Sequence, residues 1–571
     1  MRQMYMKFII AILAVTSFQR AVSARDLWIG ERNHETVSGK VTDQFGEPMQ
    51  ARVELWYADI GLIEEELGEA LPMSEQYQRN LFHAGYANEE GWFHVTAVAG
   101  SWLLRVSKGP EYEIFEMPIE ISDGELDGQR INVVLEQLYD LESMGWYSGD
   151  LHHHSVHSDG RQSPDQIYDA MVGNDIDFAA LTDHNQLRGN DVWVDYNESE
   201  FLAIPGLEVT TSAEPEVASS GKGWGHMNAI GVSRLVGATD PSNPVIGHRY
   251  LFHGVEDQQR AINETHVDGG IYQLSHSCWS MDWPDGTIST WGSLKDYDAI
   301  SVFVGWDVGP HMPTVLASEY GPSIFGTAQW NMNTMATQVW FEMLNAGNRV
   351  AGWASSDSHD VTSLQHTGAG APVYWRNTSG NARTYVHSRK LEWNAVRKAL
   401  KDGRAFVTAG FWGPLLLVNS RNAEPGDEVR IGPRGWVPLH IQVLSNRPLA
   451  GYAEGIRIIV GGEVVKTLPT VDGQMTVDVD TRIRVNPRKD TWVVVQVFGD
   501  WPSMAMTNPI YLKSPYTGWK AWGSTEWRFP EGAAEWFNPF PNHPEVTIPD
   551  GPSLPPVPIA EVVEGEYRQT Y

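Results

Sequence analysis

Alternating apolar and polar residues mark the first part of the chain, from about residue 26 to 140. Runs such as VSGKVTDQFGEPMQARVELW have the two-residue period of half-buried strands, and Gly46 and Pro48 interrupt them where the chain must turn. The later run NEEGWFHVTAVAGSWLLRVSKGPEYE repeats this pattern, with Gly91 and Gly100 at turns. The pattern predicts a small β-sandwich over this part of the chain.

The pattern changes between residues 146 and 410, where apolar runs that end in polar clusters alternate with stretches of helical period. This alternation predicts an α/β domain, and Ser163 followed by Pro164 predicts the start of a helix in SPDQIYDAMVGN. The polar residues fall at the ends of separate strands, as they do in barrel enzymes, so we expect a closed seven-stranded (βα) barrel. The expected strands are 146–154, 177–184, 201–209, 226–232, 270–276, 299–305 and 350–359.

Alternating runs return over residues 411–515 and predict a second β-sandwich. Residues 516–571 are rich in Pro and Trp without any period, which predicts an extended tail. The expected fold class is therefore α/β, with a barrel over residues 146–410 that is flanked by amino- and carboxy-terminal β-sandwich domains.

The first 24 residues have the features of an export signal. Arg2 and Lys7 precede the apolar run FIIAILAV, and the small residues that end at Ala24 offer a cleavage point. The run is far shorter than the ~20 apolar residues that a membrane-spanning helix needs, so no stable membrane insertion is expected. We expect a mature chain that begins at Arg25 and is exported to a periplasm or to the exterior.

Composition narrows the classes of function. The chain has 571 residues, with 41 Lys and Arg against 72 Asp and Glu, which gives a net charge of −31. Such a field repels phosphate backbones unless basic residues cluster tightly; no such cluster is evident in the sequence, so no nucleic-acid partner is expected. Cys278 is the only cysteine, which excludes intramolecular disulfides and cysteine-built zinc sites. A bound metal would need His and carboxylate ligands, and the oligomeric state stays open.

Histidines concentrate at the end of the first expected strand of the α/β domain. Four of them fall within residues 152–157, whereas the 19 in the whole chain would place about 0.2 in such a window. Residues two apart on a strand share a face, so His152 and His154 can bind one cation. His153 points to the opposite face and is expected to be structural.

Further potential ligands lie at the ends of the other expected strands. Burying so many polar groups without partners would cost several kcal/mol, so together they indicate a metal site rather than packing. His and carboxylate ligands suit Zn, Mn or Fe, and divalent transition metal ions are the expected cofactors. These ligands are His184, Glu208, His226, His276, Asp357 and His359.

These motifs resemble those of the PHP (polymerase and histidinol phosphatase) superfamily. DLHHHSVHSDG is similar to its first motif, and LTDHN, GLE, GHMN and SDSH are similar to the later ones, in the same order. GHMNAIG and MTNPIYL resemble in particular the exported CehA/McbA-type metallohydrolases. The sandwich predicted over residues 26–140 resembles the carboxypeptidase regulatory-like domain, a module that is usually non-catalytic.

The resemblance implies up to three divalent ions. Glu208 would bridge the first two, because a bidentate carboxylate can hold two cations ~3.5–4 Å apart with a hydroxide between them. The implied ligands are His152, His154, Glu208 and Asp357 for the first ion; Glu208, His226 and His276 for the second; and Asp159, His184 and His359 for the third.

Two further residues are candidates for catalytic roles. Asp183 precedes a ligand in LTDHN and could orient a metal-bound imidazole, which usually needs a carboxylate or carbonyl on its other nitrogen. His157 has three possible roles that stay open: it could replace Asp159 as a ligand, donate a proton to the leaving group, or lie on the surface.

Substrate contacts are expected from residues around the ligands. Arg161 and Arg188 follow the first two motifs and could bind an anionic group. Trp224, Trp279 and Trp353 flank ligands and could line a cleft for an aromatic or sugar ring.

The leading hypothesis is an exported hydrolase in which a metal-bound hydroxide attacks an ester-type bond of a small molecule, most simply a phosphoester. An aromatic or glycosidic ester is the favoured substrate. Hydrolysis of carboxylic esters or carbamates is the alternative within enzymes. A non-catalytic secreted protein that binds a glycan or a partner is the alternative from another class.

Overall fold

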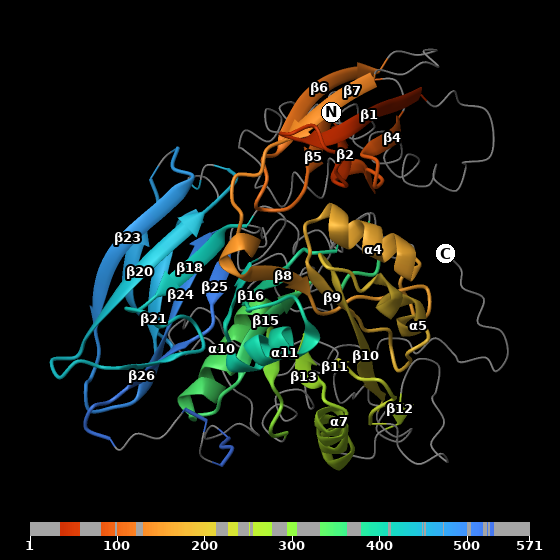
Figure 1. Ribbon diagram of the computed structural model, residues 1–571. Coiled ribbons are helices and arrows are strands. Elements are labelled where there is room, and N and C mark those ends of the chain that lie inside the picture. Colours follow the sequence, from red (N-terminus) through yellow and green to blue (C-terminus); the bar gives the residue numbers. More distant parts are fainter. Residues whose placement is uncertain are drawn as a thin grey trace, which may run out of the picture.

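The computed structural model (Figure 1) shows a sheet-rich α/β protein. The export segment 1–24, most of the tail 516–571, and Trp224, Trp279 and Cys278 lie outside the described residues. Within the described residues, no helix combines the length and apolar character needed to cross a membrane. The structure describes residues 35–57, 81–97, 100–121, 130–212, 226–237, 250–251, 255–276, 294–304, 332–361, 379–408, 413–447, 449, 453–471, 473–499, 504–517, 522–523 and 526–529.

The amino-terminal unit consists of two small sheets. One has the strand order β4-β1-β7 and the other β3-β2-β5-β6. Val41, Leu55 and Trp102, which come from both sheets, belong to one buried hydrophobic cluster. The strands are β1 (Glu35–Asp43), β2 (Arg52–Tyr57), β3 (Leu81–Tyr86), β4 (Trp92–Ala97), β5 (Gly100–Ser107), β6 (Phe115–Ile121) and β7 (Arg130–Leu135).

All seven strands expected between residues 146 and 359 are present in one sheet, in the order β15-β14-β13-β11-β10-β9-β8. An isolated parallel bridge between His153 and Ser358 joins the chain after β8 to the chain after β15. The strands are β8 (Trp146–Asp150), β9 (Phe178–Leu181), β10 (Leu202–Ser212), β11 (His226–Ile230), β13 (Ile271–Ser275), β14 (Ala299–Val304) and β15 (Ala351–Ser355), and β12 (Tyr250–Leu251) pairs with β10.

One expectation about this sheet is wrong. Strand β11 runs antiparallel to both β10 and β13, so His226 begins its strand instead of ending it. The residue still reaches the same edge of the sheet, because reversing a strand brings its first residue to the edge where its neighbours end.

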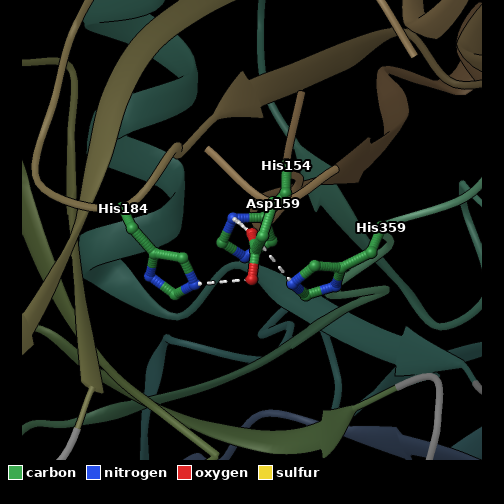
Figure 2. Close-up of side chains that lie close together, drawn as sticks. All are labelled: His154, Asp159, His184 and His359. Carbon is green, nitrogen blue, oxygen red and sulfur yellow. Dashed lines mark ion pairs between the residues drawn. The ribbon is translucent and has the colours of Figure 1, made fainter. Parts of the chain in front are cut away.

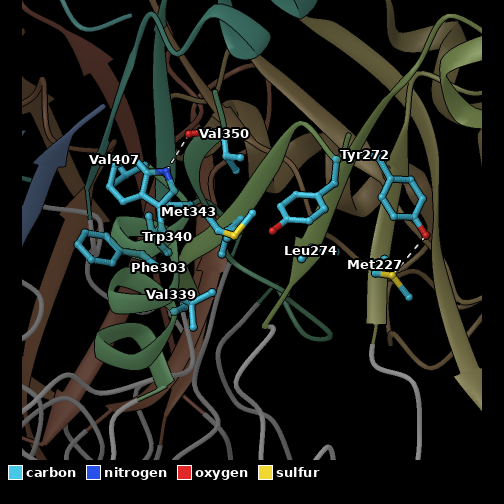
Figure 3. Packing of buried hydrophobic residues seen from close by; sticks show 14 of the residues in the cluster. Met227, Tyr272, Leu274, Phe303, Val339, Trp340, Met343, Val350 and Val407 are labelled. Carbon is cyan, nitrogen blue, oxygen red and sulfur yellow. Dashed lines mark hydrogen bonds between the residues drawn. The ribbon is translucent and has the colours of Figure 1, made fainter. Parts of the chain in front are cut away.

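The segments that connect these strands include helices, which pack against the sheet (Figure 1). In α4 (Pro164–Gly173), the Ser163 side chain and Gln166 form the reciprocal hydrogen bonds of a capping box, so the expected helix start is confirmed. Figure 3 shows Trp340 of α10 in the core beside Phe303 of β14, with its indole N–H donating to the Val350 carbonyl at 2.8 Å. The α-helices besides α4 are α5 (Asn190–Trp193), α7 (Val255–Val267), α10 (Met332–Asn345) and α11 (Trp393–Asp402), and the short 3₁₀ helices are η1 (Glu142–Met144) and η2 (Val194–Tyr196).

The large sheet continues beyond residue 410. β17 pairs with β25, so the strands that follow residue 411 are hydrogen-bonded to the α/β part of the chain. Before residue 411, the sheet contains β16 (Arg383–His387) and β17 (Ala405–Thr408). After it, the sheet contains β19 (Glu428–Arg430), β21 (Ala453–Val460), β22 (Glu463–Pro469), β24 (Thr491–Gly499), β25 (Ala505–Thr507) and β26 (Ile510–Lys513). A separate sheet holds β18 (Leu415–Asn419), β20 (Trp436–Leu444) and β23 (Thr476–Arg484).

Basic residues gather at one end of the β18-β20-β23 sheet. The guanidinium groups of Arg482 and Arg484 lie 4.6 and 5.9 Å from the ring of Trp436, which is 40% exposed. The backbone N–H of Val485 donates to Gly435 at 2.8 Å and so brings the turn that carries Arg434 to the same end. This group is small, and the absence of a nucleic-acid partner stays a prediction from the sequence.

Gly149 provides a test of how closely β8 and β9 pack. It pairs with Phe178, and a Cβ added at Gly149 would lie 2.0 Å from the phenyl ring. We expect Gly149→Ala to lower the free energy of unfolding by about 1–3 kcal/mol in urea titrations, because overpacking forces neighbouring side chains to shift. Gly432→Ala is the matched control, since the nearest atom there is 3.5 Å away and the stability should change little.

Candidate metal centre

All nine residues expected to bind metal lie in four overlapping groups at one edge of the large sheet. Within each group the potential ligand atoms lie within 4.8 Å of one another. Neighbouring groups share one residue, so the nine side chains form a continuous cluster. The groups are His152, His154 and Asp357; His152, Glu208 and His276; His184, Glu208 and His226; and His154, Asp159, His184 and His359.

The first group has the dimensions of a metal site. The Nε2 atoms of His152 and His154 lie 3.0 Å apart, and each lies 3.1 Å from Oδ1 of Asp357. Ligand atoms that bind a transition metal with bonds of about 2.0–2.2 Å lie roughly 3.0–3.4 Å from one another. The triangle therefore fits one ion bound by two imidazoles and a carboxylate.

Glu208 lies at the middle of the cluster and is fully buried. Its Oε1 lies 3.4 Å from His152, 3.0 Å from His226 and 3.2 Å from His276. Its Oε2 lies 2.8 Å from Nδ1 of His184 and 3.5 Å from Nε2 of His154. A carboxylate with imidazoles around both oxygens is suited to bridge two cations.

Figure 2 shows the fourth group, in which His154, His184 and His359 surround Asp159. Asp159 lies 3.3 Å from Nε2 of His184, 3.3 Å from Nε2 of His359 and 3.6 Å from Nδ1 of His154. The Asp159 side chain is 47% exposed, whereas that of Glu208 is 1% exposed. Solvent and substrate would therefore reach the cluster from the side of Asp159.

The number of ions that the cluster can hold is limited by the number of imidazole nitrogens available to bind them. A neutral imidazole has one nitrogen free to bind a cation, yet His154 and His184 each belong to two groups through different nitrogens. The four groups therefore cannot all be filled at once. If His154 and His184 each serve one ion and Glu208 bridges through its two oxygens, the nine residues could hold at most three ions; the resemblance implies up to three, and the number stays a prediction.

Backbone pairing beyond the regular strands places the ligands. Parallel bridges pair His184 with Glu208 and His153 with Ser358. In the antiparallel register, His226 pairs with Thr210 of β10 and with Ser275 of β13. Asp357 and His276 have φ values of 54° and 25°, a backbone conformation that few non-glycine residues adopt and that is typical of functional sites.

The histidines of the cluster differ in the direction in which their pKa values are shifted. Burial, together with the neighbouring imidazoles of His359 and His184, lowers the pKa of His154 to about 4, and burial lowers the pKa of His226 to about 4. Burial also opposes protonation of His359, but Asp159 outweighs it and raises the pKa of His359 to about 9. Glu208 and Asp159 likewise raise the pKa of His184 against the effect of burial.

The three carboxylates carry negative charge. Burial alone would raise the pKa values of Glu208, Asp357 and Asp159, but the surrounding imidazoles hold all three below the usual carboxyl range. Three deprotonated carboxylates among largely neutral imidazoles make a strong cation site, and a cation that binds there would displace the protons of His184 and His359.

His153 and Asp183 lie next to ligands in sequence, but their side chains make contacts outside the ligand groups. His153 points away from the cluster, with its Nε2 2.7 Å from the Ser379 hydroxyl, and burial lowers its pKa to about 3. The Asp183 carboxylate accepts hydrogen bonds from the Ser155 N–H at 2.8 Å and from the hydroxyls of Ser155 and Ser158 at 2.6 Å. Asp183 therefore holds the turn that carries Asp159, and its expected part in orienting a metal-bound imidazole stays a prediction.

Several contacts were missed from the sequence. The Thr210 hydroxyl hydrogen-bonds Nδ1 of His184, and the Asp357 carbonyl lies 3.0 Å from Nδ1 of His359, which leaves the Nε2 of each ring toward Asp159. Asp150 accepts N–H groups of Ser356 and Gly380 at 2.9 Å and so joins separate segments. The two-residue repeat of a strand could have revealed Thr210 and Asp150, because Thr210 follows Glu208 by two residues and Asp150 precedes His152 by two, so each shares a strand face with a ligand.

The remaining candidates belong to none of the four ligand groups. His157 belongs to none of the four groups and is half-buried, with its ring beside Gly189. Arg161 is partly exposed with its guanidinium 3.5 Å from Asp360, and Arg188 is exposed. Trp353 is fully buried in a hydrophobic cluster and does not line a cleft.

No protein-family model and no curated protein matches the sequence. Among solved structures, a two-domain protein from Bacteroides vulgatus that contains a predicted PHP-like metal-dependent phosphoesterase is 17% identical over 64% of this chain and 95% of its own, with a TM-score of 0.31. An amidohydrolase from Chromobacterium violaceum, with bound sulfate and no metal, is 13% identical over 39% of this chain and 89% of its own, with a TM-score of 0.22. The shaft pilin SpaA from Lactobacillus rhamnosus GG is 7% identical over 22% of this chain and 56% of its own, with a TM-score of 0.15. These TM-scores are too low to carry a functional conclusion, which therefore rests on the geometry of the site.

Metal content tests the central place of Glu208. We expect Glu208→Gln to lose at least two of three bound equivalents while keeping its circular dichroism, because the amide removes the negative charge that serves two ions. His153→Gln, whose side chain faces away from the cluster, should keep the full complement. Elemental analysis after dialysis against metal-containing buffer gives both values, and a Glu208→Gln protein with undiminished metal would contradict the assignment.

Proposed function

We propose that the protein is a metal-dependent hydrolase that cleaves an ester-type bond in a small molecule, with a phosphoester as the first choice. The observation that carries the proposal is Glu208, a fully buried carboxylate in contact with five imidazoles beside two further carboxylates. The sequence motifs that resemble the PHP superfamily, and within it the CehA/McbA type, support the same chemistry.

Divalent ions bound in such a cluster would lower the pKa of water and stabilise the negative charge that develops on an ester oxygen. The chain's own residues prepare the site for this role. The Asp357 carbonyl and the Thr210 hydroxyl take up Nδ1 of His359 and His184, so that the two Nε2 atoms face Asp159. We place the donor of a proton to the leaving group at His157, which lies in the same turn as Asp159 without belonging to a ligand group.

The surroundings of the site favour a substrate with little charge of its own. Arg161 is the nearest arginine in sequence to the first motif, but its guanidinium faces Asp360 instead of standing free for a phosphate. The net charge of −31 adds a weak repulsion for anions. We therefore favour a phosphodiester with an aromatic or glycosidic leaving group. Hydrolysis of a carboxylic ester or carbamate is the second candidate, because these substrates carry no phosphate charge.

The architecture proposed around this site follows the sequence analysis. We propose that the seven strands β8 to β15 close into a barrel, which the bridge between His153 and Ser358 supports. We propose β-sandwiches on either side, supported by the single hydrophobic cluster shared by the two amino-terminal sheets. A role as a non-catalytic binding protein is less well supported, because a decayed site should have lost some of its nine ligands.

Export of the chain remains a proposal from the basic start, the apolar run and the small residues that end at Ala24. We expect amino-terminal sequencing of protein recovered from its native cells to begin at Arg25. An intact Met1 on that protein would contradict export by cleavage.

Kinetic comparison of four substrates tests the reaction. We expect kcat/KM of the metal-loaded protein to be highest for an aryl phosphodiester, lower for an aryl carboxylic ester and an aryl carbamate, and lowest for a small sugar phosphate. Asp159→Asn should lower the leading value by about 100-fold or more, since even residues that only support a ligand are typically worth 10–100-fold. A preference for the carboxylic ester or carbamate would select the second candidate, and no turnover by metal-loaded protein would reject both.

A further inference from the structure

The amino-terminal unit contacts the chain segment that carries two of the metal ligands. Val361 lies two residues after His359, and its carbonyl accepts a hydrogen bond from the Arg52 guanidinium at 3.1 Å and another from the Tyr86 hydroxyl at 3.0 Å. Arg52 and Tyr86 are register partners on β2 and β3. Two neighbouring strands of the amino-terminal unit thus hold one carbonyl beside the metal centre.

Arg52 is itself held by a buried network. Its side chain is 0% exposed, and its Nε donates to Oε1 of Glu54 at 2.6 Å. The Trp56 indole N–H donates to Oε2 of the same carboxylate at 3.0 Å, and the guanidinium of Arg105 lies 4.3 Å from the Trp56 ring. A guanidinium paired in this way is costly to bury but rigid once paired, so it offers the Val361 carbonyl a fixed donor.

Tyr86 reaches the cluster by a second route. Asn174 donates to the Tyr86 oxygen at 2.8 Å and to the Ser379 carbonyl at 2.9 Å. The Ser379 hydroxyl lies 2.7 Å from Nε2 of His153, which stands between the ligands His152 and His154. The same tyrosine hydroxyl is therefore connected to both segments that supply ligands to the first group.

The rest of the segment is held by the loop of the first motif. The Val361 N–H donates to Oε1 of Gln162 at 3.2 Å, and the Arg161 N–H donates to the His359 carbonyl at 3.0 Å. Asp357 is in the left-handed region with φ 54°, so the segment is in a conformation that needs external support. The carbonyl of Val361 is where the amino-terminal unit supplies that support.

We propose that Arg52 and Tyr86 are positioning residues that make the amino-terminal unit part of the metal centre, by fixing segment 357–361 and thereby the affinity of the ion bound at Asp159, His184 and His359. The proposal deepens the proposed function and rests on it for the role of that ion. It assigns a task to strands that sequence resemblance alone describes as non-catalytic.

Hydrogen exchange on the metal-free protein tests the positioning directly. We expect Tyr86→Phe and Arg52→Lys to speed exchange of the backbone amides of Asp357 and Val361 by about tenfold, the loss expected when one hydrogen bond to the segment is removed. Tyr139→Phe is the matched control, because it removes a hydroxyl that donates to the Ser445 carbonyl at 2.9 Å and does not contact the segment.

Titration with Co²⁺, followed by its visible absorption, provides the second measurement. The ion at Asp159, His184 and His359 should be the weakest of the three equivalents, because the Asp159 side chain is half-exposed. We expect this equivalent to bind about tenfold less tightly in Tyr86→Phe and Arg52→Lys than in wild-type or Tyr139→Phe protein. Unchanged exchange and unchanged Co²⁺ affinity in both folded variants would overturn the proposal. Faster exchange in protein that binds no Co²⁺ even as wild type would sustain the contact but reject the metal-dependent function, so the two failures are distinguishable.

Discussion

The rest of the structure depends on a carboxylate that has been removed from water. Glu208 is fully buried, and an ionised carboxylate in that position is stable only if positive or hydrogen-bonding groups surround it. Five imidazoles do so, and they come from segments that follow β8, β9 and β13 and from the first residue of β11. The antiparallel β11 brings one of these rings to the carboxylate, and Asp357 and His276 lie beside it with positive φ values.

Burial changes steeply across the cluster. Glu208 and His152 are closed off from solvent, whereas Asp159, which shares His154 and His184 with the inner groups, is half-exposed. The inner residues therefore define the electrostatic field, and the outer residues meet the solvent. In the proposed hydrolase, the inner residues would form the rigid part of the site and the outer residues would meet the substrate.

Sequence patterns predicted the seven strands and gathered the nine ligand residues, because histidines two apart and polar strand ends are local signals. The direction of β11 could not be predicted, since nothing within HMNAIGV records which neighbour it pairs with. The hydrogen bonds of Asp183 could not be predicted either, because its serine partners lie 25 and 28 residues earlier in the chain. Likewise, the contact of Arg52 with Val361 spans 309 residues and depends on tertiary packing that no local pattern encodes.

The pairing of β17 with β25 has a consequence for synthesis of the chain. β17 ends at Thr408, and its partner begins at Ala505, about a hundred residues later. A ribosome adds ~5–20 residues per second, so the edge of β17 stays without its neighbour for ~5–20 s after it emerges. During that interval its free N–H and C=O groups can pair with another nascent chain. Because β17 gains its neighbour β25 only late in synthesis, correct assembly of the sheet requires that the edge of β17 be kept from pairing with other chains until then.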